Sequence, residues 1–252
     1  MSASFDLHGK CAVVTGASKG LGRAIALALA GAGADVVGVD RTPEDETAEE
    51  VRRLGRRFHV IQADLSDAAC IPDIVAEAGR THGAVDILVN NAGTIRRRPA
   101  EDFTEADWDD VMNVNLRSVF FLCQAAGRAM LRTGNGGKII NIASMLSYQG
   151  GFTVASYTAS KHGVAGITKL LANEWAAKGI NVNAIAPGYF ATDNTQALRD
   201  DPKRSAAILD RIPAGRWGEP ADLAGAAVFL ASRASDYLHG SIVAVDGGWL
   251  AR

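Results

Sequence analysis

The chain has 252 residues, 48% hydrophobic and 21% charged, as expected for a folded globular domain rather than a disordered or fibrous chain. Its formal net charge of −2 lacks the basic excess typical of proteins that bind nucleic acid or anionic membranes, so neither partner is expected. Cys11, Cys70 and Cys123 are odd in number and widely spaced, and the first residues show no signal peptide, so we expect a cytoplasmic protein with reduced thiols.

Short apolar runs alternate with segments of helical periodicity along the whole chain. We predict strands at residues 12–15, 35–39, 59–62, 87–90, 138–142, 181–185 and 242–245. The clearest helical segments are residues 21–32, 68–80, 105–130, 156–177 and 220–230. Nearly continuous apolar runs are typical of strands that are covered on both faces. We therefore predict an α/β fold over residues 1–252: a single domain with a doubly wound, parallel, seven-stranded sheet of Rossmann type and helices on both faces.

A glycine-rich segment, TGASKGLG at residues 15–22, separates the first predicted strand from the first helix. Glycines at such a turn let backbone N–H groups approach a pyrophosphate at the positive end of a helix. In isolation the segment is equally compatible with a plain turn, but its place between strand and helix favours dinucleotide binding. The predicted contacts are Gly16, Ser18, Lys19, Gly20, Leu21 and Gly22.

The ends of the next three strands supply further cofactor contacts. Asp40 ends the second strand, where a carboxylate accepts hydrogen bonds from ribose hydroxyls and repels a 2′-phosphate. It therefore predicts NAD rather than NADP, although Arg41 beside it is a group that suits a phosphate. Asp64 and Leu65 are predicted at the adenine, and Asn91, Ala92 and Gly93 beside the cofactor; a turn or a strand-end cap is the alternative for both groups.

Tyr157 and Lys161 are four residues apart on a predicted helix, so both side chains project from one face. A tyrosine titrates near pH ~10, and a nearby positive charge lowers its pKa toward the range useful for proton transfer. A solvated helix face is the usual explanation of such a pair in isolation. No cluster of His, Cys and Asp has the spacing of a metal site, so no metal is expected.

Taken in order, these motifs resemble the short-chain dehydrogenase/reductase family over nearly the whole chain. The resemblance rests on residues 15–22, Asp64, residues 90–93, Asn115, Ser144, Tyr157 with Lys161, and residues 187–188. It implies that Tyr157 is the general acid and base, that Ser144 bonds the reacting oxygen, and that Lys161 holds the nicotinamide ribose and lowers the tyrosine pKa. It further implies that Asn115 anchors a relay water and that Pro187, Gly188 and Thr192 flank the nicotinamide.

Within that family, residues 93–97, 142–151, 186–196 and 246–252 look like dehydrogenases of sugar acids, although Tyr148 stands where we expect Phe. The expected substrate is a small sugar acid, and a guanidinium suits its carboxylate. Arg96, Arg97, Gln149 and Asn194 are the candidate substrate contacts, with a solvated charge run as the alternative for the arginines. Residues 188–213 are predicted to form a substrate loop, and the resemblance implies a homotetramer.

Other functions stay open at this point. A gluconate 5-dehydrogenase, a 3-oxoacyl-carrier-protein reductase and a polyol dehydrogenase share the same motifs. A nicotinamide-sensing protein without catalysis is the alternative from a different class, and it usually lacks the tyrosine–lysine pair that is intact here.

Overall fold

Within residues 4–43 and 45–252, which the computed structural model describes, seven parallel strands form one sheet in the order β3-β2-β1-β4-β5-β6-β7. Every predicted strand is confirmed to within two residues. The strands are β1 Cys11–Thr15, β2 Asp35–Asp40, β3 Phe58–Gln62, β4 Ile87–Asn90, β5 Gly137–Ile142, β6 Ile180–Pro187 and β7 Ile242–Val245.

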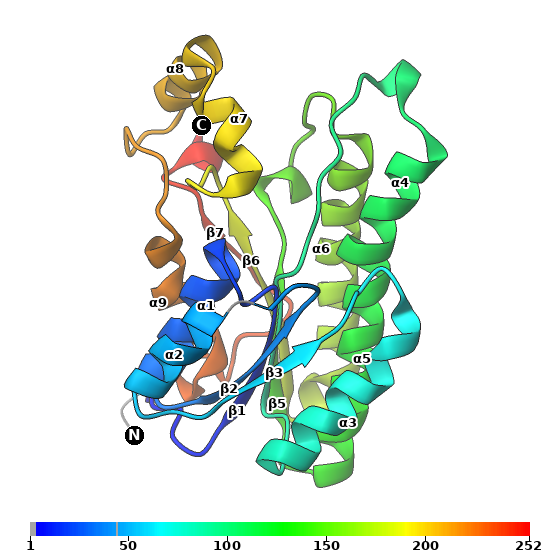
Figure 1. Ribbon diagram of the computed structural model, residues 1–252, viewed down its shortest axis with the longest axis vertical. Helices are drawn as coiled ribbons and strands as arrows, with labels where there is room; N and C mark the ends of the chain where they lie inside the picture. The colour runs from blue at the N-terminus through cyan, green and yellow to red at the C-terminus, as the bar shows by residue number, and fades with distance from the viewer. Residues whose placement is uncertain (1–3, 44) are drawn as a thin grey trace.

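Helices cover both faces of this sheet, as predicted (Figure 1). One face carries α3 Ile71–His82, α5 Ser118–Thr133 and α6 Ala155–Trp175, with α4 Glu105–Met112 leading into α5. The other carries α1 Gly20–Gly31, α2 Asp45–Arg53 and α9 Ala224–Ala231. The helix α2 is not among the predicted segments, because its residues DETAEEVRR are mostly polar and only Thr47, Ala48 and Val51 are buried. No helix in the described ranges is long and apolar enough to cross a membrane.

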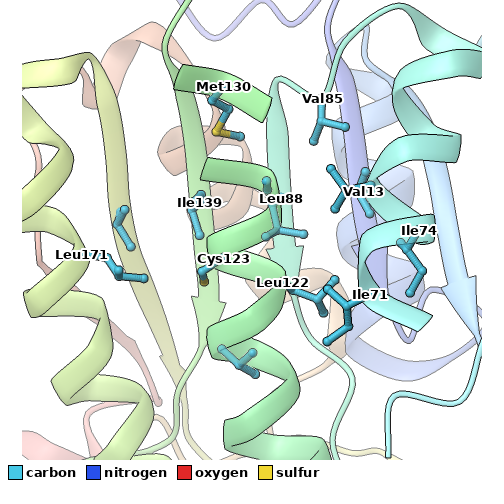
Figure 2. Packing of buried hydrophobic residues seen from close by; sticks show 14 of the residues in the cluster. Val13, Ile71, Ile74, Val85, Leu88, Leu122, Cys123, Met130, Ile139 and Leu171 are labelled. Carbon is cyan, nitrogen blue, oxygen red and sulfur yellow. The ribbon is translucent and has the colours of Figure 1, made fainter. Parts of the chain in front are cut away.

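The larger core lies between the sheet and the layer of α3, α5 and α6 (Figure 2). Val13, Leu88 and Ile139 point from three neighbouring strands toward Ile74 of α3 and Leu122 of α5. Burial of each such side chain stabilises the fold by about 1.5–3 kcal/mol. This packing fixes the helices and the strand ends, and therefore the positions of the residues that follow each strand.

The strand order reverses between β1 and β4, where Val13 is paired with Val37 on one side and with Leu88 on the other. In a parallel sheet a crevice opens beyond the carboxyl ends of the strands at this point. Residues 188–213, predicted to be an irregular substrate loop, form α7 Gln196–Arg199 and α8 Pro202–Arg211, which lie together at one end of the molecule (Figure 1). These two short helices lie close to the chain's C-terminus.

One predicted helix is wrong in detail. Residues 105–130 were expected to form one helix, but a π-helical turn, Asn113–Arg117, separates α4 from α5. A π turn inserts one extra residue into the helical ladder, and such insertions are frequent at functional sites. Hydrophobic periodicity does not reveal it, because the apolar residues resume their helical spacing after the turn. Asn115 lies in the middle of this turn and is fully buried.

Candidate active site

A cavity of about 800 Å³ lies where the carboxyl ends of β1, β2, β4, β5 and β6 meet. Most of the residues predicted for the cofactor and the chemistry line it together. These are Gly16, Ser18, Lys19, Gly20, Leu21, Gly22, Asp40, Asp64, Leu65, Asn91, Ala92, Gly93, Arg96, Ser144, Tyr157, Lys161, Pro187, Gly188, Thr192 and Asn194. The other predicted residues, Asn115, Arg97 and Gln149, lie outside this lining.

The glycine-rich turn has the geometry of a dinucleotide cradle. Gly16 and Gly20 have φ values of +68° and +57°, which favour glycine. A Cβ on Gly22 would lie 1.9 Å from the carbonyl oxygen of Gly16, so α1 packs against the turn more closely than any side chain permits. A Cβ on Gly20 would meet only the Thr192 side chain, at 3.8 Å, and this room at the N-terminus of α1 fits a bound pyrophosphate.

Two side chains tie this turn to the end of β4. The hydroxyl of Thr15 accepts hydrogen bonds from the backbone N–H groups of Asn91 at 3.0 Å and of Ala92 at 2.9 Å. The Asn91 amide donates to the carbonyl oxygens of Thr15 at 2.9 Å and of Gly16 at 3.1 Å. The two strand ends on either side of the reversal point therefore move as one unit.

The acidic residues after β2 and β3 are also on the cavity wall. A carboxylate oxygen of Asp40 accepts a hydrogen bond from the N–H of Ala17 at 3.0 Å, which fixes the carboxylate beside the glycine turn. Arg41 lines the same part of the cavity. Hydrogen bonding from the Ser66 N–H, at 2.9 Å, lowers the pKa of Asp64 and keeps it ionised.

Ser144, Tyr157 and Lys161 line the cavity together. Ser144 follows β5, while the other two come from successive turns of α6. The Lys161 ammonium lies 5.5 Å from the centre of the Tyr157 ring and donates a hydrogen bond to the carbonyl oxygen of Ile142 at 2.6 Å. The Ser144 side chain lies beside the Tyr157 phenol and lowers its pKa. This arrangement can hold a substrate oxygen between two hydroxyl groups.

The electrostatics of the pair differ from the prediction. Burial raises the pKa of Tyr157, while a hydrogen bond from Ser144 and the charge of Arg97 pull it down. Lys161 is not among the groups that lower the tyrosine pKa. Burial lowers the pKa of the lysine to about 8, so the ammonium loses its proton, and its charge, below the pH at which the phenol ionises. Burial thus outweighs the groups that lower the pKa of Tyr157, contrary to the net lowering expected from the sequence. The lowering of this pKa by Lys161 remains a prediction.

Asn115 holds the loop after β4 in place. Its carbonyl oxygen accepts from the Thr94 N–H at 2.8 Å, and its amide donates to the Thr94 carbonyl oxygen at 2.8 Å. Both polar atoms of the side chain thus bond to the backbone of one residue. The relay water remains a prediction.

The candidate substrate residues separate into different environments. Arg96 forms an ion pair with Asp110 at 2.8 Å, whereas Arg97 donates to the backbone carbonyl of Asn194 at 2.8 Å. Tyr148 is half exposed, and its hydroxyl donates to the Ile242 carbonyl at 3.1 Å. Arg96 lines the cavity, whereas Arg97 is the arginine whose charge lowers the pKa of Tyr157.

Sequence reasoning missed several residues of the site. Thr94, Val114 and Phe190 line the cavity but were not predicted as site residues, although Thr94 and Phe190 lie within the segments 93–97 and 186–196 that resemble sugar-acid dehydrogenases. Tyr189 and Arg204 interact electrostatically with Arg97. Their only signal in the sequence is that they fall in or beside the predicted substrate loop. No group of three or more His, Cys, Asp or Glu side chains suited to a metal ion occurs in the part of the chain that the structure describes.

Comparison with known proteins identifies the family to which a chain with this site belongs. A family described as enoyl-(acyl carrier protein) reductase matches residues 16–250. The chain belongs to the short-chain dehydrogenase/reductase family of oxidoreductases, which confirms the resemblance seen in the motifs.

The names of individual relatives also specify a substrate. The chain is 62% identical over 250 residues to 2-dehydro-3-deoxy-D-gluconate 5-dehydrogenase of Escherichia coli, covering 99% of each chain. It is 61% identical to the enzyme of the same name from Dickeya dadantii, over 99% of this chain and 98% of the relative. A crystal structure from Agrobacterium tumefaciens, provisionally described as a 2-deoxy-D-gluconate 3-dehydrogenase with bound NADP, has a TM-score of 0.95 and 57% identity, covering 100% of both chains.

Proposed function

We propose that this protein is an NAD-dependent oxidoreductase that interconverts a keto and a hydroxy sugar acid, with 2-dehydro-3-deoxy-D-gluconate as the hydroxy form. The observation that carries the proposal is that Ser144, Tyr157 and Lys161 line the same cavity as the glycine-rich turn. The names of the relatives at 61–62% identity support the substrate class.

The proposed chemistry is a proton transfer coupled to a hydride transfer. When bound, the nicotinamide supplies the hydride that adds to the carbonyl carbon of the substrate. Tyr157 gives its phenolic proton to the carbonyl oxygen as the new C–H bond forms, and the phenolate then regains a proton from solvent. Ser144 donates a hydrogen bond to the same oxygen and stabilises its developing negative charge. Lys161, fixed by the Ile142 carbonyl, is placed to hold the nicotinamide ribose.

The pKa of Tyr157 gives the two directions of the reaction opposite pH dependences. Because burial raises this pKa, the phenol is protonated at neutral pH and is ready to donate in the reduction. Oxidation of the alcohol needs the phenolate as a base, so its rate is expected to rise with pH above neutrality.

Tyr157→Phe tests the assignment. We expect kcat to fall about 10²–10⁴-fold, with unchanged binding of NADH, because the proton donor is lost and the ring is kept. Tyr148→Phe is the matched control, since it removes a phenol that bonds to the Ile242 carbonyl and lies outside the cavity lining. Retention of most of the dehydrogenase activity in Tyr157→Phe would refute the mechanism.

The proposed cofactor preference rests on Asp40, whose carboxylate is fixed beside the glycine turn and would repel a 2′-phosphate. Arg41 is the opposing group on the cavity wall, and NADP is bound in the Agrobacterium structure. The ratio of kcat/KM for NADH and NADPH decides between them. We expect NADH to be preferred by the wild type, and Asp40→Ala to reduce that preference while Arg41→Ala increases it. Equal efficiencies in the wild type would contradict the proposal.

We propose that residues 188–213, with α7 and α8, form the substrate loop. Gln149 and Asn194 are retained as proposed hydroxyl partners of the sugar, and Thr192 as a nicotinamide contact. Asn194 and Thr192 line the cavity, which supports their assignment, whereas Gln149 lies outside the lining.

A gluconate 5-dehydrogenase is the second candidate function, favoured by a relative of that name in Gluconobacter oxydans at 44% identity. Turnover of 2-dehydro-3-deoxy-D-gluconate and D-gluconate, compared side by side, separates the two.

We further propose a homotetramer in the cytoplasm. Exposed apolar side chains on the helices α4, α5 and α6 support assembly, since Trp108, Phe121, Leu131 and Leu170 are 37–47% exposed. Cys11, Cys70 and Cys123 are free thiols, which suits a reducing compartment. Light scattering coupled to gel filtration tests the assembly, and Phe121→Asp is expected to shift the mass toward smaller species. A monomeric wild type would contradict this proposal.

A further inference from the structure

Helix α8 carries an arginine, Arg204, one turn before an apolar contact with the segment that follows Ser144. Arg204 and Ile208 are four residues apart on α8, so their side chains lie along one stripe of the helical surface, and Ile212 directly follows the helix. Ile208 and Ile212 are buried in an apolar cluster with Met145, which directly follows Ser144. This contact turns the stripe toward the catalytic side of the molecule, and Arg204 lies one turn before Ile208 at the exposed end of the stripe.

Arg97 lies in the loop that follows β4. Its guanidinium donates to the Asn194 carbonyl at 2.8 Å, in the segment that leads into α7. Burial lowers the pKa of Arg97, Tyr157 raises it, and the charge of Arg204 lowers it further. Leu198 of α7 packs against the apolar cluster that contains Ile208 of α8, so the Arg97 guanidinium and α8 flank the same short segment. The charges of Arg97 and Arg204 act on each other, and the charge of Arg97 also acts on the phenol of Tyr157.

The pairing of the neighbouring arginines makes Arg97 distinctive. Arg96 forms an ion pair with Asp110 at 2.8 Å, and Arg98 forms one with Asp107 at 2.9 Å. In the described residues Arg97 has no carboxylate partner, and its bond to the protein is to a backbone carbonyl. Three consecutive arginines thus divide into two that are neutralised and one that is not.

Arg204 is likewise without a hydrogen-bonded or ion-paired partner for its side chain in residues 4–43 and 45–252, and its guanidinium is exposed. Two like charges held near each other without an anion repel, and an anion placed between them removes that repulsion. A carboxylate suits this position, because guanidinium forks bind its two oxygens in a fixed plane.

We propose that Arg97 and Arg204 together bind the carboxylate of the substrate, Arg97 from the loop after β4 and Arg204 from α8. This inference rests on the proposed function, in which the substrate is a sugar acid. It gives α8 a specific role. The substrate carboxylate attracts Arg204 and so holds α8 over the site, whereas a neutral sugar leaves the repulsion between the two arginines in place. Discrimination between acidic and neutral sugars then resides in this pair.

The two arginines are expected to differ in one measurable way. Arg97 lowers the pKa of Tyr157, whereas Arg204 is not among the groups that act on it. Arg97→Met should therefore move the pH profile of alcohol oxidation to higher pH, in addition to weakening substrate binding. Arg204→Met should weaken substrate binding and leave the pH profile in place.

The test compares Arg204→Met with Lys203→Met, which removes the same charge from the adjacent residue of the same helix. The substrates are 2-dehydro-3-deoxy-D-gluconate and its neutral primary amide, with NAD⁺ as oxidant. We expect Arg204→Met to raise KM for the acid about 10- to 100-fold, as loss of a charged hydrogen bond does, with KM for the amide unchanged. Lys203→Met should resemble the wild type, and the melting temperature of Arg204→Met should not fall, since a repulsion is removed.

Any of three results would overturn the inference. Equal losses for acid and amide in Arg204→Met, or an equal loss in Lys203→Met, would show that no carboxylate is bound there, while the proposed function stands. A wild-type enzyme that turns over the amide as efficiently as the acid would refute the sugar-acid proposal and this inference with it. If Arg204→Met folds poorly, Arg204→Gln measured in the same way replaces it.

Discussion

Replacing Gly22 by alanine probes the glycine cradle directly. The added Cβ would lie 1.9 Å from the Gly16 carbonyl oxygen and 2.3 Å from the Asn91 amide nitrogen, where real Cβ contacts stay beyond 3.0 Å. The backbone must therefore move by about 1.1 Å, the difference between 3.0 and 1.9 Å. Overpacking of this kind typically costs about 1–3 kcal/mol. For a chain of this size that lowers the melting temperature by about 2–12 °C.

The same shift displaces Gly16, which lines the cavity, so NADH affinity should fall at least about tenfold, or 1.4 kcal/mol. Gly31→Ala is the matched control, because it makes the same change at the other end of α1, where nothing lies within 4 Å of the new Cβ. It should raise stability by up to about 1 kcal/mol through helix propensity. Thermal unfolding and NADH fluorescence titration measure both effects. An unchanged melting temperature and affinity in Gly22→Ala would refute the close packing of α1 against the turn.

Two further predictions follow from burial. The pKa of Lys161 is lowered from 10.5 to about 8, so the folded protein binds fewer protons than the unfolded chain between these values, and stability rises with pH there. The free energy of unfolding of the wild type, relative to Lys161→Met, should increase by about 2 kcal/mol from pH 7.5 to 10 in urea titrations; a constant difference would contradict the lowered pKa. Burial also raises the pKa of Cys11 and Cys123 to about 12, so maleimide should label only the part-exposed Cys70 in the folded protein and all three thiols in urea. Mass spectrometry showing rapid labelling of Cys123 before unfolding would contradict its burial.

A buried polar network illustrates what local patterns omit. The Asn90 amide donates to the Asn141 carbonyl oxygen at 2.8 Å and to the sulfur of Cys123 at 3.2 Å, and Asn141 donates to Thr168 at 2.9 Å. These bonds join β4, β5, α5 and α6 inside the core. None of the four residues is near another in the sequence, so no spacing rule links them, and only the packing of the sheet against the helices brings them together.

The sequence by itself determined the features that depend on short-range geometry. Alternating apolar runs and helical segments predicted the parallel sheet, the glycine spacing predicted the cradle, and a separation of four placed Tyr157 and Lys161 on one helix face. The tertiary structure alone decided what depends on the surroundings of a group. Burial reversed the expected direction of the Tyr157 pKa, a π turn buried Asn115, and the fold placed the charge of Arg204 where it lowers the pKa of Arg97. Desolvation and like-charge proximity are set by neighbours that are distant in the chain, and a pattern of adjacent residues carries no record of them.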